Sequence, residues 1–193
     1  MKFKESELAH KYCIGHGLEL GAAAHNPFGL KDCLNVAPDY DFEFFKQSQV
    51  DLCGEFSEID IFGTASAIPV ESSKFDYVVS SHVIEHVSDP IQAFWEWNRV
   101  LKPNGIIFMI FPKRDALPSD VGRPLSGIAD FIKRYNVRRA PADEGHIWVF
   151  SLQSMIDLIE YCNKTYSLGW GIIEALETDD KVGNGHTIVC RKI

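Results

Sequence analysis

The chain of 193 residues is 46% hydrophobic and 24% charged, and its formal net charge is −8. This length fits a single domain, over residues 1–193, that can bury a substantial core. No apolar run is long enough to cross a membrane, and the acidic balance disfavours nonspecific binding to nucleic acid, which requires a basic surface.

Two features of the sequence favour the cytoplasm. The N-terminal stretch MKFKESELAHKYC is polar and shows no secretory apolar region. The cysteines lie about twenty or more residues apart with no Cys-x-x-Cys pair, which predicts free thiols and neither disulfides nor a zinc site. They are Cys13, Cys33, Cys53, Cys162 and Cys190. We therefore expect a cytoplasmic protein without a metal site.

The first strand is expected over residues 15–21, where Leu18 and Leu20 alternate with polar neighbours. It ends at Gly21, followed by three alanines. A strand that ends in such small residues lets a ligand approach the backbone closely. The other elements expected in this half of the chain are a helix over 5–12, a strand over 33–36, a helical turn over 42–47 and a strand over 59–62.

Residues 75–112 predict a strand, a helix and a second strand. The first strand covers residues 75–81, and Asp89 with Pro90 supplies an N-cap and a first helical residue. The apolar face of the helix consists of Ile91, Phe94, Trp95 and Leu101. We expect residues 103–105 to end this helix and residues 106–111 to form a parallel strand covered on both faces.

The C-terminal part predicts a helix capped by Ser151 and strands over 168–176 and 186–190. The turn-rich connection 179–185 fits an antiparallel hairpin. The fold class is therefore α/β, a mostly parallel sheet of seven strands with one antiparallel strand in a C-terminal hairpin and helices on both faces.

Residues 113–147 are too long for an ordinary connection and predict a functional insertion or lid, with a helix near 128–135. Between residues 113 and 140 this insertion holds seven bases and three acids, a balance of +4. The bases are Lys113, Arg114, Arg123, Lys133, Arg134, Arg138 and Arg139. They form either a wall that faces an anion or a solvated helix face.

In such sheets a ligand binds beyond the carboxyl ends of the strands, which here are residues 21–24, 80–86 and 112–114. The stretch SSHVIEHVSDP, the following LKPNG and the earlier GLELG together resemble the Rossmann-like, class I methyltransferases that use S-adenosylmethionine. The resemblance covers most of residues 14–112. RPLSGIADFI followed by GHIWVFSLQSM resembles a bacterial subgroup associated with glycan or cell-surface polysaccharide biosynthesis.

The resemblance implies roles for several residues. Glu19 would steer the amino group of the cofactor's methionine part, and Gly21 with Ala22 would let the backbone lie against the cofactor. Ser80, Ser81 and His82 would line the side of the methionine and the sulfonium.

Two departures from the family pattern weaken the cofactor site. Ala37 stands where an acid usually binds the ribose, which leaves Asp39 as the nearest substitute, and Thr64 beside Ala65 stands where an acid faces the adenine. A non-catalytic relative that has lost the cofactor therefore stays an alternative. A nicotinamide-dependent reductase is disfavoured because the chain has no G-x-G-x-x-G spacing after Gly21.

His82-Val83-Ile84-Glu85-His86 spells the H-x-x-E-H pattern of some zinc peptidases. That pattern requires a continuous helix that presents both histidines on one face. The strand exit before His82 and the Ser88-Asp89-Pro90 restart predict no such helix. We expect His82 to be a pocket residue and His86 to contact the substrate or to hold the structure by hydrogen bonds.

The acceptor of the methyl group is expected to be a small molecule or glycan. If it reacts through a hydroxyl, a histidine is suited to take its proton, because the ordinary pKa of histidine is near neutral. His146 is the favoured base, with His82 as the second candidate. Arg114 and Arg123 are expected to bind an anionic group of the acceptor, because arginine pairs with carboxylate or phosphate through two parallel hydrogen bonds.

Overall fold

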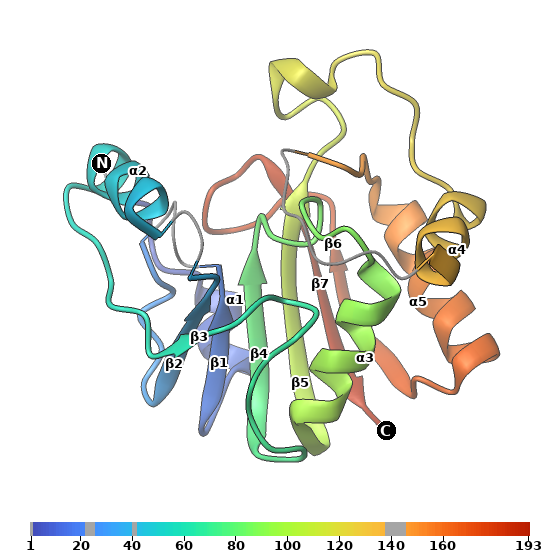
Figure 1. Ribbon diagram of the computed structural model, residues 1–193, viewed down its shortest axis with the longest axis horizontal. Helices are drawn as coiled ribbons and strands as arrows, with labels where there is room; N and C mark the ends of the chain where they lie inside the picture. The colour runs from blue at the N-terminus through green and yellow to red at the C-terminus, as the bar shows by residue number, and fades with distance from the viewer. Residues whose placement is uncertain (1, 22–25, 40–41, 138–145) are drawn as a thin grey trace.

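The computed structural model of the protein describes residues 2–21, 26–39, 42–137 and 146–193. At its centre lies a seven-stranded sheet with the order β3-β2-β1-β4-β5-β7-β6 (Figure 1). The strands are β1 (Gly17–Leu20), β2 (Cys33–Ala37), β3 (Ile61–Phe62), β4 (Phe75–Ser81), β5 (Leu101–Pro112), β6 (Trp170–Leu176) and β7 (Gly185–Lys192). β7 is antiparallel to β5 and β6, and the other pairs are parallel. The predicted sheet with one reversed strand is confirmed.

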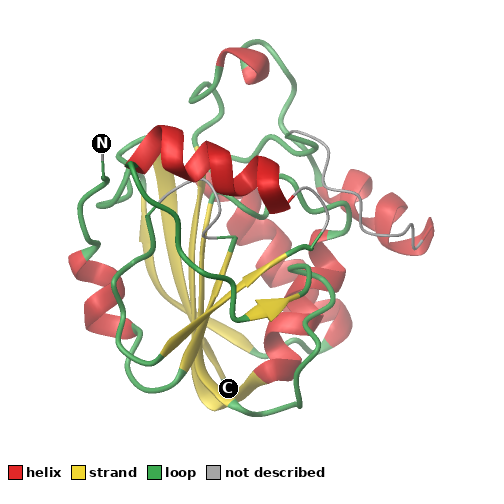
Figure 2. Ribbon diagram, turned by 60° about the vertical axis from the view of Figure 1, so that its left-hand side comes forward, coloured by secondary structure: helices red, strands yellow, loops and turns green. Residues whose placement is uncertain are grey.

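Helices cover both faces of the sheet (Figures 1 and 2). They are α1 (Glu7–Tyr12), α2 (Phe42–Cys53), α3 (Pro90–Val100), α4 (Ile128–Val137) and α5 (Leu152–Tyr166), with a short 3₁₀ turn, η1 (Pro118–Asp120). Trp97 of α3, Phe131 of α4 and Met155 of α5 pack in one apolar cluster. Ala9 of α1 packs in a second cluster with Phe28. Because successive strand residues point to opposite faces, β4 and β5 contribute side chains to both clusters.

The unit β4-α3-β5 forms largely as its sequence predicts. The Asp89 side chain accepts a hydrogen bond from the Gln92 backbone N–H at 2.9 Å, so it caps the helix that begins at Pro90. The helix ends at Val100, and Leu101 opens β5 instead of lying on the helix. Leu101 pairs with Phe75, and the register then shifts before the next pair, so that residues 102–105 are included in the strand as an irregular step.

Other boundaries also differ from the prediction. α2 continues to Cys53, well beyond the helical turn expected over 42–47, and β3 has only two residues. All five cysteines are free thiols, and four of them are buried. Across the described ranges, the helices are either too short or too polar for any of them to traverse a lipid bilayer.

The strand order reverses direction between β1 and β4. β1 pairs with β2 on one side and with β4 on the other, so that the chain winds away from this point in both directions. Such a switch point is where ligands bind in open α/β sheets, beyond the carboxyl ends of the strands. After β5 the chain rises above these carboxyl ends before it returns to α4 (Figure 1). The fold therefore gathers the ends of β1 and β4 and the segment after β5 at one edge.

Candidate functional site

The end of β1 carries a buried carboxylate followed by a glycine. Glu19 is 4% exposed, and its Oε2 accepts a hydrogen bond from the Phe28 backbone N–H at 3.1 Å. Burial raises the pKa of Glu19 to about 7, although the Phe28 N–H and the charge of Lys181 both act to lower it. Gly21 has a φ of +71°, and a Cβ there would lie 2.5 Å from Cγ2 of Val83. The end of β1 at Gly21 therefore lies directly against Val83, in the segment that follows β4.

Lys181 is a charged neighbour of Glu19 that the sequence reasoning missed. It is 3% exposed, its Nζ donates to the Pro27 carbonyl oxygen at 3.3 Å, and the same nitrogen lies 4.6 Å from the centre of the Phe28 ring. Burial lowers the pKa of Lys181, while the charge of Glu19 acts to raise it. The turn between β6 and β7 therefore brings a lysine to the carboxyl end of β1.

The end of β4 offers two buried hydroxyls. Ser80 and Ser81 are 1% and 7% exposed, and neither Oγ has a hydrogen-bond partner among the described residues. A buried hydroxyl without a partner costs free energy, and a ligand with polar groups can restore the missing bond. This observation fits the sequence prediction that these serines line the methionine side of the cofactor. Ala22, which was predicted to lie against the cofactor together with Gly21, is outside the described residues.

The predicted ribose and adenine contacts lie farther along the same edge. Ala37 ends β2 and is 3% exposed, and its carbonyl oxygen accepts a hydrogen bond from the Gly63 N–H at 2.9 Å. Asp39, the expected substitute for a ribose acid, is exposed just beyond the strand. Thr64 is half-buried, and the carbonyl oxygen of Ala65 accepts a hydrogen bond from the Trp97 indole at 2.8 Å. The structure keeps these residues near one another but places no carboxylate at Ala37 or Thr64.

The H-x-x-E-H residues form turns between β4 and α3, as expected, and not a helix. His82 has a φ of +55°, and its backbone N–H donates to the Ile110 carbonyl oxygen at 2.9 Å. The backbone N–H of His86 donates to the Val83 carbonyl oxygen at 3.0 Å. The left-handed conformation of His82 turns the chain sharply, so that Glu85 points inward.

Glu85 is the centre of a histidine cluster. Its side chain is fully buried, and its Oε1 lies 3.6 Å from His82 Nδ1, 3.8 Å from His86 Nε2 and 3.8 Å from His146 Nε2. The rings of His86 and His146 meet edge to face with their centres 4.7 Å apart. The structure thus unites the two histidines of the motif with the predicted base from the insertion.

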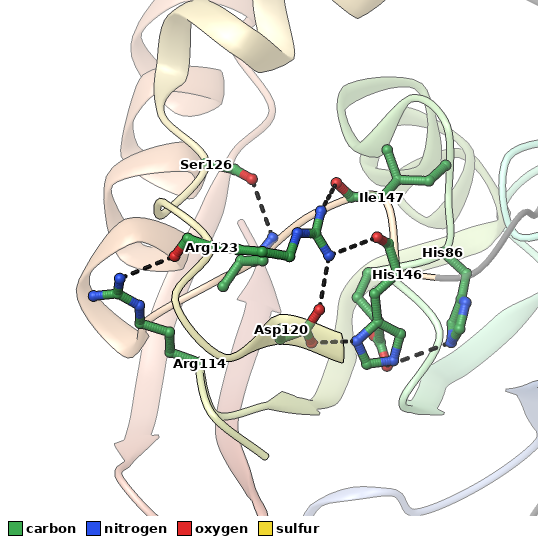
Figure 3. A network of polar contacts seen from close by, with 9 residues as sticks. His86, Arg114, Asp120, Arg123, Ser126, His146 and Ile147 are labelled. Carbon is green, nitrogen blue, oxygen red and sulfur yellow. Dashed lines mark hydrogen bonds and ion pairs between the residues drawn. The ribbon is translucent and has the colours of Figure 1, made fainter. Parts of the chain in front are cut away.

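A carboxylate and a guanidinium fix the orientation of His146 (Figure 3). His146 Nδ1 lies 2.6 Å from Oδ2 of Asp120, which is 1% exposed. Arg123 donates from Nη1 to Asp120 Oδ1 at 2.7 Å and to the His146 carbonyl oxygen at 2.9 Å. Its Nη2 donates to the Ile147 carbonyl oxygen at 3.0 Å. The arrangement leaves His146 Nε2 facing Glu85.

The two arginines predicted to bind the acceptor have different surroundings. Both donor nitrogens at the tip of Arg123 are bonded inside the protein, so the structure uses this side chain to hold Asp120 and the His146 backbone in place. Arg114 is exposed, and its Nη2 donates to the Arg123 carbonyl oxygen at 2.9 Å, on the far side of Arg123 from the histidines (Figure 3). Arg138 and Arg139 lie outside the described residues.

The chain after the insertion is tied to the turn after β4. The backbone N–H groups of Ile147 and Trp148 both donate to the Glu85 carbonyl oxygen, at 2.8 and 3.1 Å. The indole N–H of Trp148 donates to the Val87 carbonyl oxygen at 2.6 Å. His146 therefore enters the site from a segment that main-chain bonds hold against the motif, whereas the sequence predicts that it approaches from a movable lid.

Sequence reasoning missed Asp120 and underestimated Glu85. Asp120 lies in a loop whose prolines and glycines give no sign of a buried acid. Glu85 carries a usable signal, because it is an acid inside the apolar run Val83-Ile84 to Val87. The expectation of no metal site rests on residues near one another in sequence, whereas the structure places His146, sixty residues away, beside Glu85 and His86. The oxygen of Glu85 and the nitrogens of His86 and His146 lie within 4.8 Å of one another.

Part of the chain is similar to known methyltransferases. Residues 14–109 match the model of the methyltransferase domain family. Demethylmenaquinone methyltransferase from Staphylococcus aureus strain JH9 is 36% identical over 58 residues, which are 30% of this chain and 24% of that protein. Enzymes of the same description from other strains match equally. The chain thus spans about a quarter of the length of these curated relatives.

Solved structures share the fold over nearly the whole chain. A methyltransferase from Thermotoga maritima, described as a possible histamine N-methyltransferase, has a TM-score of 0.59 and 18% identity, and the match covers 96% of this chain and 86% of that one. A methyltransferase from Methanosarcina mazei also has a TM-score of 0.59, with 16% identity and coverage of 100% and 99%. Both are described as dependent on S-adenosylmethionine. At these identities the likeness establishes the α/β fold.

Proposed function

We propose that this chain is an S-adenosylmethionine-dependent methyltransferase and that it transfers a methyl group to a hydroxyl of a small anionic sugar or glycan. The observation that carries the proposal is the meeting of Glu19, Gly21 and the two buried serine hydroxyls at the switch point of the sheet. This is the place where open α/β sheets bind their ligands. The family match covers the same strands.

S-adenosylmethionine, when bound, supplies a methyl group that the sulfonium already activates. Glu19 holds the amino group of the methionine part, and its buried position strengthens this attraction once the carboxyl is ionised. Gly21 leaves space between β1 and Val83 that a side chain would fill. Ser80 and Ser81 contribute hydroxyls, and this chain's main task is to align the acceptor oxygen with the methyl group and to exclude water.

The acceptor hydroxyl loses its proton to His146 in this proposal. Nδ1 is engaged by Asp120 at 2.6 Å, so Nε2 is the nitrogen that can receive a proton. A carboxylate on the other ring nitrogen orients a catalytic histidine and stabilises its protonated form, and Asp120 is placed to do both. His82 shapes the floor of the pocket from the end of β4, beside Glu85.

The choice of acceptor rests on the basic insertion and on the likeness of its sequence to the glycan-associated subgroup. Arg114 is exposed, on the far side of Arg123 from the histidines, and we expect it to meet a carboxylate or phosphate of the acceptor. The quinone substrate in the name of the Staphylococcus relatives is not transferred to this chain, because the match covers 58 residues only. A sugar hydroxyl also needs a base such as His146 more than an acidic phenol does.

A second candidate is a methyltransferase-like protein that no longer binds the cofactor. The buried Ala37 favours it, because this position offers no carboxylate to the ribose hydroxyls. A nicotinamide-dependent reductase has no such support, because the chain lacks the glycine spacing of dinucleotide sites and its family match is to methyltransferases.

Titration calorimetry of the whole protein tests the proposal. We expect both S-adenosylmethionine and its demethylated product to bind at one site per chain, with NADPH as a comparison ligand that does not bind. The Glu19→Gln variant keeps the size of the side chain and should bind S-adenosylmethionine at least tenfold more weakly, because the charged partner of the amino group is lost. Absence of binding by the wild-type chain would favour the non-catalytic candidate, and binding of NADPH alone would favour a reductase.

A further inference from the structure

Glu85 is a buried carboxylate without a hydrogen bond. Its side chain has no exposed surface, and neither of its oxygens has a hydrogen-bond partner among the described residues. Glu19, the other buried glutamate of this edge, accepts a backbone N–H. A buried charge that lacks hydrogen bonds is costly unless a positive charge or a metal ion compensates for it. The surroundings of Glu85 therefore need a further positive group.

The spacing around Glu85 is that of ligands around a shared ion. His86 Nε2 and His146 Nε2 each lie 3.8 Å from Oε1, which is too far for a hydrogen bond. Two ligands of a tetrahedral zinc ion, each about 2.0–2.1 Å from the metal, lie about 3.3 Å apart. The three ligand atoms lie within 4.8 Å of one another, so a small contraction brings them to that spacing. His82 lies outside this group of three.

The outer groups of the cluster are arranged as in metal centres. Asp120 binds Nδ1 of His146 at 2.6 Å, and Arg123 binds the second oxygen of Asp120 at 2.7 Å (Figure 3). A histidine that ligates a metal through one ring nitrogen commonly donates from the other to a carboxylate, which fixes the ring and its tautomer. The Ile147 and Trp148 N–H groups hold the Glu85 carbonyl oxygen, so the main chain fixes the distance between the two segments.

We propose that Glu85, His86 and His146 form a binding site for a zinc-class divalent ion. Two imidazoles and one carboxylate suit zinc and its first-row neighbours, whereas magnesium and calcium prefer oxygen ligands alone. The side chain of His86 is 35% exposed, while Glu85 and His146 are buried. The ion can therefore enter past His86, and three protein ligands leave a fourth position for a water or an acceptor oxygen.

The ion changes how the acceptor is activated. With the ion bound, His146 Nε2 would be a ligand and no longer a base, and an acceptor hydroxyl in the fourth position would release its proton to solvent water on the exposed side of His86, because the metal lowers the pKa of that hydroxyl. His146 acts as the base in the protein without the ion. This role of the ion rests on the proposed methyl transfer, whereas binding of the ion does not.

Binding of zinc to chelator-treated protein tests the site. We expect wild-type protein to bind one zinc ion per chain in a calorimetric titration and to be stabilised against heat by it. Glu85→Gln and His146→Gln should each weaken zinc binding at least 100-fold. Asp120→Asn, which keeps all three ligands, should weaken it about 10- to 100-fold. His16→Gln serves as the matched control, because His16 pairs with the exposed Asp32 away from this site, and it should bind zinc like wild type.

Other outcomes overturn the proposal. The site is refuted if wild-type protein binds no stoichiometric zinc, or if Glu85→Gln binds zinc with wild-type affinity. The stability of the zinc-free variant guards against misfolding as an explanation: Glu85→Gln should be at least as stable as wild type, because it removes the buried charge. S-adenosylmethionine binding is measured on the same zinc-free samples. Wild-type protein that binds the cofactor but no zinc refutes the metal site alone, and wild-type protein that binds zinc but not the cofactor refutes the proposed function alone.

Discussion

Two buried glutamates at one edge of the sheet have opposite surroundings. Burial raises the pKa of Glu19 at the end of β1, although this carboxylate accepts the Phe28 N–H and has the charge of Lys181 nearby, which both act to lower the pKa. Glu85 after β4 has no hydrogen bond among the described residues and faces three histidines at 3.6–3.8 Å. The backbone N–H and the lysine beside Glu19 suit a carboxylate that binds the cation of an organic ligand. Imidazole nitrogens suit one that shares a proton or a metal ion.

The different surroundings of Glu19 and Glu85 suggest two separate roles at the carboxyl ends of the strands. In the proposed function the Glu19 region holds the cofactor, and the Glu85 region activates the acceptor. The two regions approach each other closely at Gly21, where an added Cβ would lie 2.5 Å from Cγ2 of Val83, three residues after Ser80. Variants on either side of this close approach should therefore change one role without the other, and they are taken here from the largest expected effect to the smallest.

Removal of the base should have the largest effect on turnover. His146→Ala takes away the proton acceptor, and the loss of a general base lowers the rate by about 10²- to 10⁴-fold. Cofactor affinity should stay at the wild-type value, because His146 belongs to the Glu85 region. Both quantities are measured on zinc-free protein by single-turnover methyl transfer and by calorimetry. Full activity of His146→Ala, together with reduced activity of His82→Ala, would transfer the role of base to His82.

A side chain on Gly21 should abolish cofactor binding. In Gly21→Val the positive φ of +71° strains the backbone and the new Cβ meets Val83, so we expect affinity for S-adenosylmethionine to fall about 100-fold or more. The matched control is Gly54→Val, since Gly54 has a φ of +86° with nothing within 4 Å of its Cβ position. That variant should lose about 1–2 kcal/mol of stability and no cofactor affinity. Equal affinity in both variants would separate Gly21 from the cofactor site.

The sequence predicts features that depend on neighbouring residues, and it fails for features that depend on contacts between distant parts of the chain. The strand 75–81 and the helix start at Asp89 agree with the structure because hydrophobic runs and capping residues act locally. Leu101 was misplaced because a strand register with Phe75, far away in sequence, decides its conformation. The contacts of Asp120, Lys181 and His146 were beyond prediction for the same reason, since each depends on a loop that folds back over the edge of the sheet.

The raised pKa of Glu19 predicts a change of stability with pH. Burial raises this pKa from 4.5 to about 7, so between these values the folded protein holds a proton that the unfolded chain releases. The resulting stabilisation is complete below pH 4.5 and is lost as the pH rises to about 7, a change of about 3 kcal/mol. Urea unfolding at several pH values should show this loss in wild type and not in Glu19→Gln.

The same ionisation should control cofactor binding in the opposite direction. The amino group of S-adenosylmethionine attracts the ionised carboxylate, so affinity should increase as the pH rises through about 7. Calorimetry of wild type and Glu19→Gln at pH 6 and pH 8 measures the difference. A wild-type affinity that does not change over this range would mean that Glu19 does not meet the amino group.

The two arginines of the insertion should give the smallest effect on the acceptor and distinguish positioning from contact. Arg114→Ala should raise the KM for an anionic acceptor about twofold to fivefold with kcat unchanged, because its side chain is exposed. Arg123→Ala removes hydrogen bonds to Asp120 and to the His146 carbonyl oxygen. It should therefore lower kcat, and it should also lower the free energy of unfolding by about 1–3 kcal/mol. Lys133→Ala, another exposed base of the insertion, is the control and should match wild type. If Arg114→Ala and Lys133→Ala have the same KM, the basic residues form a solvated face. If Arg123→Ala changes only the KM for the acceptor, Arg123 contacts the acceptor directly. In that case Asp120 orients His146 without help from Arg123.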